Sequence, residues 1–249
     1  MGKNKLKKFA EMKGFRCVVE APSFDIINTG HELKGKWNED FFTNAAPIVL
    51  ELGCGKGEYT VGLARRNPLK NYVGVDIKGA RIYTGAKTVE EEKIPNAGFL
   101  RTQIECIPAF FGPGEVSGIW ITFPDPQLKK TNKRLTSTRF LRYYRQFMGP
   151  DGVVNLKTDS PFLYEYTRRL ARLNGLQIID DTDDLYSREE DCIEKEIKTF
   201  YEQQWLSRGK TIKLLKFRIG DRPLEEPDVS DLEPDDYRAA ARFNRGEKS

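Results

Sequence analysis

Three glycines and one acidic residue have the spacing of a nucleoside-binding loop. Gly53, Gly55 and Gly57 follow a short apolar run, residues 48–52, and precede an amphipathic stretch. Glycine in such a turn lets the backbone bend sharply and lets a ligand approach closely. Asp76 ends the next apolar run, where a carboxylate can accept hydrogen bonds from both hydroxyls of a ribose. These residues predict a cofactor that contains a nucleoside.

The spacing of the glycines favours S-adenosylmethionine over a dinucleotide. A dinucleotide loop has the pattern Gly-x-Gly-x-x-Gly and places a pyrophosphate at the helix N-terminus. Here the pattern is Gly-x-Gly-x-Gly, and Glu58 begins the helix. A carboxylate there would repel a pyrophosphate, whereas S-adenosylmethionine has no phosphate and carries a positive sulfonium. Glu51 could attract the ammonium group of its methionine part, and Gln103 could reach the edge of its adenine.

A stiff acidic loop follows the apolar run 119–123. Its sequence is Phe-Pro-Asp-Pro, and each proline favours an extended conformation for the preceding residue, Phe123 or Asp125. Ligands of open α/β sheets bind at the carboxyl ends of the strands. We therefore expect Asp125 to point into the reaction site.

A cationic stretch comes next. The sequence has seven Lys or Arg residues between positions 129 and 145, and no acidic residue between Asp125 and Asp151. Such a stretch beside a reactive carboxylate predicts a surface that binds RNA phosphates. Net charge agrees, because the chain carries +4 overall while residues 221–249 alone carry −4, which leaves a basic body suited to a polyanion.

These motifs resemble those of the bacterial tRNA (guanine-N7)-methyltransferase family. The matching segments cover about residues 47–218 and are 50–57, 74–76, 123–126, Lys129 with Lys133 and Arg134, 158–159 and 199–202. The resemblance implies transfer of a methyl group from S-adenosylmethionine to N7 of the guanine at position 46, in the variable loop of tRNA. Departures from the family pattern are Gln127, Leu128, Leu135 and Gln103.

The resemblance also assigns roles to single residues. Asp125 is the residue expected to be catalytic, and it would position the guanine together with Asp159. The cofactor set is Glu51, Gly53, Gly55, Gly57, Asp76, Gln103 and Asp125. The substrate and RNA set is Lys129, Thr131, Asn132, Lys133, Arg134, Asp159, Thr199 and Glu202. Guanine N7 has a lone pair and no proton, so the attack needs no general base, which agrees with a single histidine, His31.

Three other functions remain open from the residues. One is a methyltransferase that acts on an exocyclic amine of another nucleic acid or a protein, although the usual Asp/Asn-Pro-Pro-aromatic loop is absent. The second is an NAD-dependent oxidoreductase. The third is an RNA-binding protein that has lost catalysis, against which the intact glycine loop, Asp76 and Asp125 argue.

The elements that must position these residues alternate between strand and helix. Strands are expected at 48–52, 72–76, 99–100, 119–123, 153–156, 176–179 and 212–217. A helix is expected at 161–174, ended by Gly175. The order predicts an α/β protein with the Rossmann-like class I methyltransferase fold, a mostly parallel seven-stranded sheet with an antiparallel edge. Residues 1–46 are predicted to be a basic N-terminal arm, 47–220 the methyltransferase domain and 221–249 an acidic, flexible tail.

Composition limits the cellular setting. No apolar run approaches the ~20 residues of a membrane span, and no secretory signal follows the basic start, so we expect a cytoplasmic protein. The four cysteines are scattered without a Cys-x-x-Cys pair, so no metal site is expected. The expected partner is tRNA, and the family resemblance allows a monomer or a homodimer.

Overall fold

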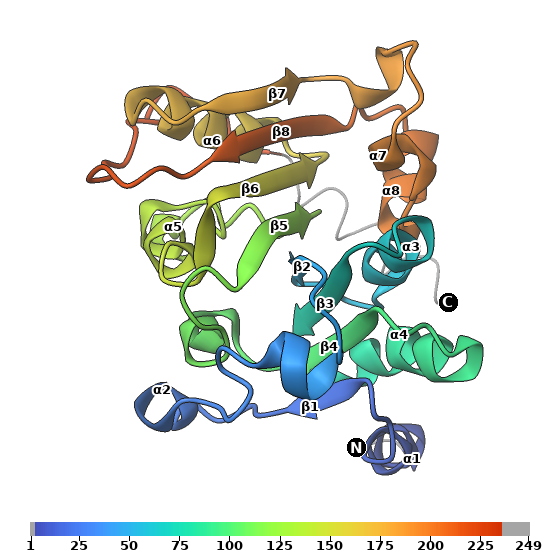
Figure 1. The fold of residues 1–249 in the computed structure, drawn as a ribbon. Helices are drawn as coiled ribbons and strands as arrows, with labels where there is room; N and C mark the ends of the chain where they lie inside the picture. The colour runs from blue at the N-terminus through green and yellow to red at the C-terminus, as the bar shows by residue number, and fades with distance from the viewer. Residues whose placement is uncertain (1–2, 236–249) are drawn as a thin grey trace.

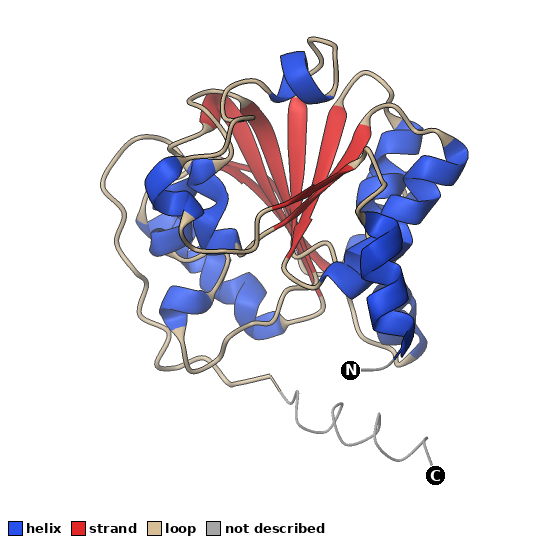
Figure 2. Ribbon diagram, turned by 90° about the horizontal axis from the view of Figure 1, so that it is seen from below, coloured by secondary structure: helices blue, strands red, loops and turns tan. Residues whose placement is uncertain are grey.

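A computed structural model describes residues 3–235 of the chain. Eight strands form one sheet in the order β1-β4-β3-β2-β5-β6-β8-β7, and helices cover both of its faces (Figure 2). The strands are β1 (Val18–Glu20), β2 (Ile48–Leu52), β3 (Asn71–Asp76), β4 (Ala97–Arg101), β5 (Val116–Thr122), β6 (Met148–Thr158), β7 (Ile178–Thr182) and β8 (Lys213–Arg218). Only β8 runs antiparallel to its neighbours, β6 and β7.

This architecture confirms the predicted α/β fold, with one strand more than expected. The additional strand, β1, pairs in parallel with β4 at the sheet edge. Its three residues include only Val18 and Val19 as apolar side chains, too few to produce a strand pattern in the sequence. The antiparallel strand lies second from the opposite edge, between β6 and β7 (Figure 1).

Two layers of helices flank the sheet. One layer, α1 (Lys3–Met12), α3 (Glu58–Arg66) and α4 (Gly79–Glu92), covers β2, β3 and β4. The other layer contains α5 (Thr138–Tyr144) and α6 (Pro161–Leu173), with α6 against β6 and β8. The remaining helices are short: α2 (Ile26–Thr29), α7 (Ile193–Glu196), α8 (Phe200–Ser207), η1 (Trp37–Phe41), η2 (Ile104–Ala109), η3 (Thr131–Lys133) and η4 (Leu185–Ser187).

Local sequence explains the ends of α6. The hydroxyl of Ser160 accepts a hydrogen bond from the amide of Leu163 at 2.9 Å, and Pro161 occupies the first turn, where a missing N–H costs nothing. Gly175 follows the helix with φ 58°, the left-handed conformation that glycine tolerates best. The predicted stop at Gly175 is therefore confirmed.

The first 46 residues, predicted to be an N-terminal arm, contact the rest of the domain where the structure describes them. The indole of Trp37 is fully buried and donates a hydrogen bond to the carbonyl of Phe110 at 2.8 Å. The carboxylate of Glu115 accepts hydrogen bonds from the amides of Gly35 and Trp37. The described part of this segment thus packs on the rest of the domain, with the helix α1 against α4 and shorter elements after it.

The start of the predicted tail also packs on the domain. We call residues 221–235 the C-terminal strap. It runs over α5 and α6, where Leu224 is buried and Asp231 forms an ion pair with Arg169. The rest of the predicted tail, residues 236–249, lies outside the described residues. Among residues 3–235, the search for a helix long and apolar enough to cross a membrane finds none.

Candidate active site

The glycine loop after β2 has one open face. Gly53, Gly55 and Gly57 have φ values of 77°, 57° and 73°, which favour glycine because a β-carbon is strained there. A β-carbon built on Gly57 would lie 2.5 Å from the ring of Phe99, whereas one on Gly53 or Gly55 would meet no atom within 4 Å. Gly57 therefore serves packing, and the other two leave space for a ligand.

Asp76 is fixed beside this open face. One carboxylate oxygen accepts a hydrogen bond from the amide of Gly55 at 3.0 Å, and the other from the amide of Lys78 at 2.8 Å. A carboxylate oxygen has two acceptor positions, so each keeps one for a ligand. The prediction of a ribose-binding carboxylate at the end of β3 has the geometry it requires.

Two pockets meet at Gly53. The Asp76 pocket, about 220 Å³, is lined by residues that include Asp76, Thr102, Gln103 and Phe140. The Thr199 pocket, about 100 Å³, is lined by Glu51, Gly55, Thr122, Phe123 and Thr199, among others. A ligand with a nucleoside at one end and a short polar tail at the other can span both, crossing the open face of the glycine loop.

Glu51 lies at the floor of the Thr199 pocket and is held by two threonines. Its carboxylate accepts hydrogen bonds from the amide and the hydroxyl of Thr60 and from the hydroxyl of Thr122. Burial raises the pKa of Glu51 to about 7, against the lowering effect of these hydrogen bonds. Its contacts within the protein join α3 to the ends of β2 and β5, in addition to any contact with a cofactor.

The Glu51→Gln substitution is expected to remove a pH-dependent part of the stability. Because its folded-state pKa is raised from 4.5 to about 7, Glu51 binds a proton more tightly in the folded protein than in the unfolded chain. Its contribution is present at low pH and is lost as the pH rises through this window, by about 3 kcal/mol. Urea unfolding of wild type and variant at pH 5 and pH 8 checks this. The prediction would be contradicted if the free energy of unfolding changed equally between the two pH values in both proteins.

The Phe-Pro-Asp-Pro loop connects the two pockets. Phe123 lines the Thr199 pocket and Gln127 lines the Asp76 pocket. Both have a positive φ, 49° and 50°, so the prediction of an extended Phe123 is wrong. The amide of Phe123 donates to the carbonyl of Lys157 at 2.8 Å, which holds this residue at the end of β5 while the chain turns away from the sheet.

Asp125 is exposed at the tip of this loop. One of its oxygens accepts a hydrogen bond from the amide of Gln127 at 2.9 Å. Asp125 lines neither of the two pockets, although Phe123 lines one and Gln127 lines the other. It thus lies in the loop that joins the two pockets, and its catalytic role stays a prediction.

The segment between β7 and β8 supplies another side of the Thr199 pocket. Thr199 caps α8 by accepting a hydrogen bond from the amide of Glu202 at 3.2 Å, and it lines the Thr199 pocket. Asp159, at the end of β6, is buried and forms an ion pair with Lys210 at 3.6 Å. These two predicted substrate residues therefore come from different elements. Asp159 directly follows β6, whereas Thr199 lies between α7 and α8.

Glu202 is buried in the core. Its carboxylate is fully buried, 2.7 Å from the ammonium group of Lys157, and accepts a hydrogen bond from the hydroxyl of Tyr186 at 2.8 Å. Burial lowers the pKa of Lys157, and Glu202 opposes that effect. The acceptor atoms of Glu202 thus face the core in this structure, and its contact with the substrate stays a prediction.

Arg134 is also buried. Its side chain is 2% exposed and bonds backbone carbonyls of the Phe-Pro-Asp-Pro loop and the residues after it. The guanidinium therefore bonds the protein itself in this structure, and its contact with an RNA phosphate stays a prediction.

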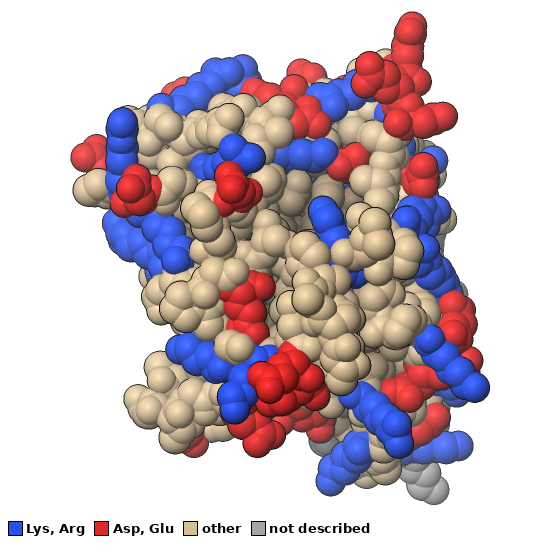
Figure 3. Space-filling model, in the orientation of Figure 1, with Lys and Arg blue, Asp and Glu red and all other residues tan. Residues whose placement is uncertain are grey.

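The other cations of the stretch divide into paired and exposed residues. Lys133 forms an ion pair with Glu105 at 2.7 Å beside the Asp76 pocket, and Thr131 and Asn132 share its short helix, η3. Lys129 and Lys130 are exposed and form no ion pair with another residue of the described part. These two lysines are therefore the candidates for phosphate contact. On the face in Figure 3 positive and negative side chains are interspersed.

Two aromatic residues of the matched segment 199–202 also line the site. Phe200 and Tyr201 line the Thr199 pocket and are 49% and 48% exposed. The ammonium group of Lys56 lies 5.0 Å from the ring centre of Phe200. They fall between Thr199 and Glu202 in the sequence, and the family resemblance implies that this whole segment lines the substrate side. Exposed rings beside a small pocket can stack on a base.

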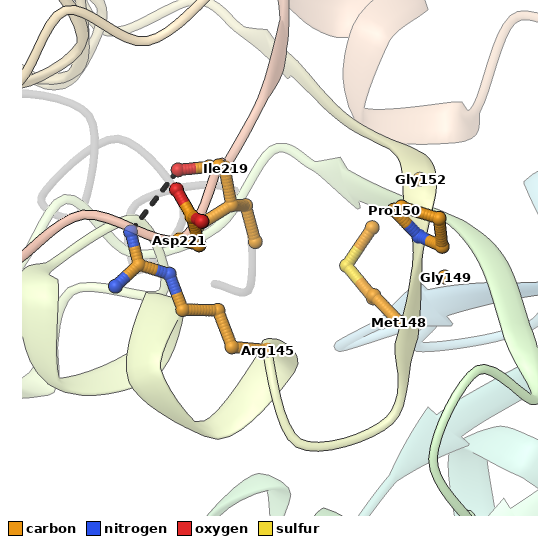
Figure 4. A pocket seen from close by; sticks show the side chains of 8 residues that line it. Arg145, Met148, Gly149, Pro150, Gly152, Ile219 and Asp221 are labelled. Atoms are coloured by element: carbon orange, nitrogen blue, oxygen red, sulfur yellow. Dashed lines mark hydrogen bonds between the residues drawn. The ribbon is translucent and has the colours of Figure 1, made fainter.

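A further cavity lies at the other end of the sheet. It has a volume of about 560 Å³ and is lined by Arg145, Met148, Pro150, Ile219 and Asp221, among others (Figure 4). These residues flank the start of β6 and the end of β8, opposite the carboxyl ends where the two site pockets lie. The only histidine, His31, lines neither site pocket; its ring accepts a hydrogen bond from the amide of Leu33.

Comparisons with known proteins agree with this geometry. Residues 45–215 match a family described as "Putative methyltransferase". A tRNA (guanine-N(7)-)-methyltransferase of Bacteroides thetaiotaomicron is 51% identical over 100% of this chain and 98% of its own. Proteins of the same name from Porphyromonas gingivalis and Bacillus subtilis are 54% and 34% identical, over 96% and 75% of this chain and 98% and 86% of their own.

A solved structure with the same fold supports the architecture. The 16S rRNA methyltransferase KamB superposes with a TM-score of 0.58 at 18% identity, over 77% of this chain and 96% of its own. At this identity the likeness concerns the fold alone.

Proposed function

The chain belongs to the tRNA (guanine-N7)-methyltransferase family, and on this premise we propose that it methylates N7 of the guanine at position 46, in the variable loop of tRNA. The observation that carries the proposal is the open face of Gly53 and Gly55 between two pockets, with Asp76 beside it, in a chain that matches this family over its whole length. A tRNA substrate implies a cytoplasmic enzyme. Monomer and homodimer both remain predictions.

The methyl donor is S-adenosylmethionine, which supplies an electrophilic methyl group on a sulfonium. In our proposal Asp76 accepts hydrogen bonds from the ribose hydroxyls, since each of its oxygens keeps a free acceptor position. Gln103 lies in the same pocket and faces the adenine. The methionine part extends across Gly53 and Gly55 into the Thr199 pocket, above Glu51.

Alignment of the guanine is the main task left to the protein. N7 attacks the methyl carbon without losing a proton, so catalysis depends on holding the two atoms in line at ~3–3.5 Å before transfer. Positive charge grows on the purine during this attack, and nearby carboxylates stabilise it. We assign this role to Asp125 and Asp159, with Thr199 at the pocket rim and Phe200 and Tyr201 as faces on which the base can stack.

Incubation of the chain with unmodified tRNA and S-adenosylmethionine labelled in the methyl group tests the activity. We expect the label in 7-methylguanosine at the variable loop, identified by nuclease digestion and mass spectrometry. A tRNA with adenine in place of that guanine is the control and should take up no label. Label in an N2-methyl or N6-methyl nucleoside would support the exocyclic-amine alternative instead.

Asp125→Ala is expected to lower kcat about 10²-fold, because it removes a charge that stabilises the developing positive charge in the transition state. Because Asp125 is exposed and, among residues 3–235, bonds only the amide of Gln127, the variant should keep the fold. Its circular dichroism spectrum should therefore be unchanged. Single-turnover methylation measures the effect. Turnover within threefold of wild type would exclude Asp125 from catalysis.

A further inference from the structure

Arg134 bonds the backbone of the loop that carries Asp125. Its Nε donates to the carbonyl of Pro126 at 3.3 Å, and its Nη2 donates to the carbonyl of Leu128 at 3.0 Å. These two carbonyls stand on either side of Gln127, whose φ is 50°. The planar fork of a guanidinium fixes two acceptors at once, so Arg134 ties this turn of the loop at two points.

The guanidinium is itself held by α6. It lies 4.8 Å from the ring centre of Phe162 and 4.5 Å from that of Tyr166, within the range of cation–π contacts. Arg134 thus contacts two aromatic rings of α6 on one side and the loop on the other. No carboxylate among the described residues forms an ion pair with it, and its Nη1 has no hydrogen-bond partner among them.

The C-terminal strap holds one of these rings, that of Tyr166, in place. The hydroxyl of Tyr166 donates to the carboxylate of Glu226 at 2.6 Å. The other oxygen of Glu226 accepts from the amide and the hydroxyl of Thr138, at 2.9 and 2.7 Å, at the start of α5. A continuous set of contacts therefore runs from Glu226 through Tyr166 and Arg134 to the backbone beside Asp125.

We propose that Arg134 is a positioning residue for methyl transfer, and that Tyr166 and Glu226 of the strap support it. The proposal rests on the proposed function, because it concerns the placement of Asp125 at the reaction site. The loop needs such support, since Phe123 and Gln127 at its two ends are both in the left-handed region, a conformation that persists only when the surroundings impose it.

Kinetics of two variants test the proposal against a phosphate contact. Arg134→Lys keeps the charge but loses the planar fork, and we expect kcat to fall about 10²-fold, as for small misplacements of reacting groups. Tyr166→Phe keeps the ring beside the guanidinium but removes the hydroxyl that bonds Glu226, and kcat should fall about fivefold. In both, KM for tRNA and the salt dependence of tRNA binding should stay unchanged.

Two controls bracket these results. Tyr164→Phe removes a hydroxyl from the same helix, one bonded to the carboxylate of Asp181 and remote from Arg134, so kcat should not change. Lys129→Ala removes an exposed cation, and the slope of log K against log salt should fall by ~0.7–0.9. The proposal would be overturned if Arg134→Lys kept the wild-type kcat but had a higher KM for tRNA and a flatter dependence of log K on log salt.

Hydrogen exchange gives a readout that does not depend on activity. Amides of residues 125–130 should exchange about tenfold faster in Arg134→Lys and Tyr166→Phe, and at the wild-type rate in Tyr164→Phe. Unchanged exchange in both variants would also overturn the proposal. If Arg134→Lys does not fold, Tyr166→Phe decides. If the wild type does not methylate tRNA, the proposed function fails, while the exchange data still decide whether Arg134 immobilises the loop.

Discussion

Replacement of Asp76 by alanine is expected to weaken binding of S-adenosylmethionine about 10³-fold. Two charge-assisted hydrogen bonds to the ribose hydroxyls would be lost, each contributing roughly 1.5–3 kcal/mol. The amides of Gly55 and Lys78, which now donate to this carboxylate, would also lose their acceptor, so the glycine loop would lose its fixed position. Isothermal titration calorimetry of the purified variant measures the change.

The Asp76→Asn variant refines this test. An amide has one acceptor oxygen, so its NH₂ group must face one of the two backbone N–H donors, whichever way it is turned. We expect an intermediate loss of affinity. Asp25→Ala, which removes an exposed carboxylate bonded to Ser23, is the matched control and should bind like wild type. Affinity of Asp76→Ala within threefold of wild type would place the nucleoside elsewhere.

Lys157→Met is expected to lower the free energy of unfolding by about 3–5 kcal/mol, the loss typical of a broken buried ion pair. The ammonium and the Glu202 carboxylate are both 0% exposed, so the variant would leave a negative charge in the core. It would also remove the donor to the carbonyl of Ile197 at 3.2 Å. Urea denaturation followed by circular dichroism measures the change.

Two further variants identify the cause of that loss. In Lys157→Met with Glu202→Gln neither charge of this pair remains, so the double variant should be more stable than Lys157→Met alone. Arg65→Met breaks a surface pair in which Arg65 and Glu92 are both 47% exposed, and it should lower stability by no more than about 1 kcal/mol. An equal loss in Arg65→Met and Lys157→Met would show that burial of the pair has no effect.

Strands that are buried on both faces were the most predictable part of the fold. The bounds of β2 match the predicted residues, because a fully buried parallel strand is a continuous apolar run with glycines after it. The same reasoning placed β3 and its terminal Asp76. The glycine loop and its carboxylate could therefore be predicted, since both follow directly from strand ends.

The roles of charged residues were the least predictable part. Arg134 and Lys129 belong to one cationic stretch, but Arg134 is buried because Phe162 and Tyr166 arrive from a helix further along the chain. Glu202 is buried because Lys157 meets it from another strand. A stretch of cations in sequence shows how many charges there are, whereas which of them water reaches is decided by residues distant in the chain.

The edge strand β1 has a consequence for folding. Its partner strand is β4, and the ion pair that joins the two, Glu20 with Arg101, spans 81 residues. Strands β2, β3 and β4 can associate before this long loop closes. We therefore expect the sheet edge at β1 to form late in folding, after the strands that carry the cofactor loop have associated.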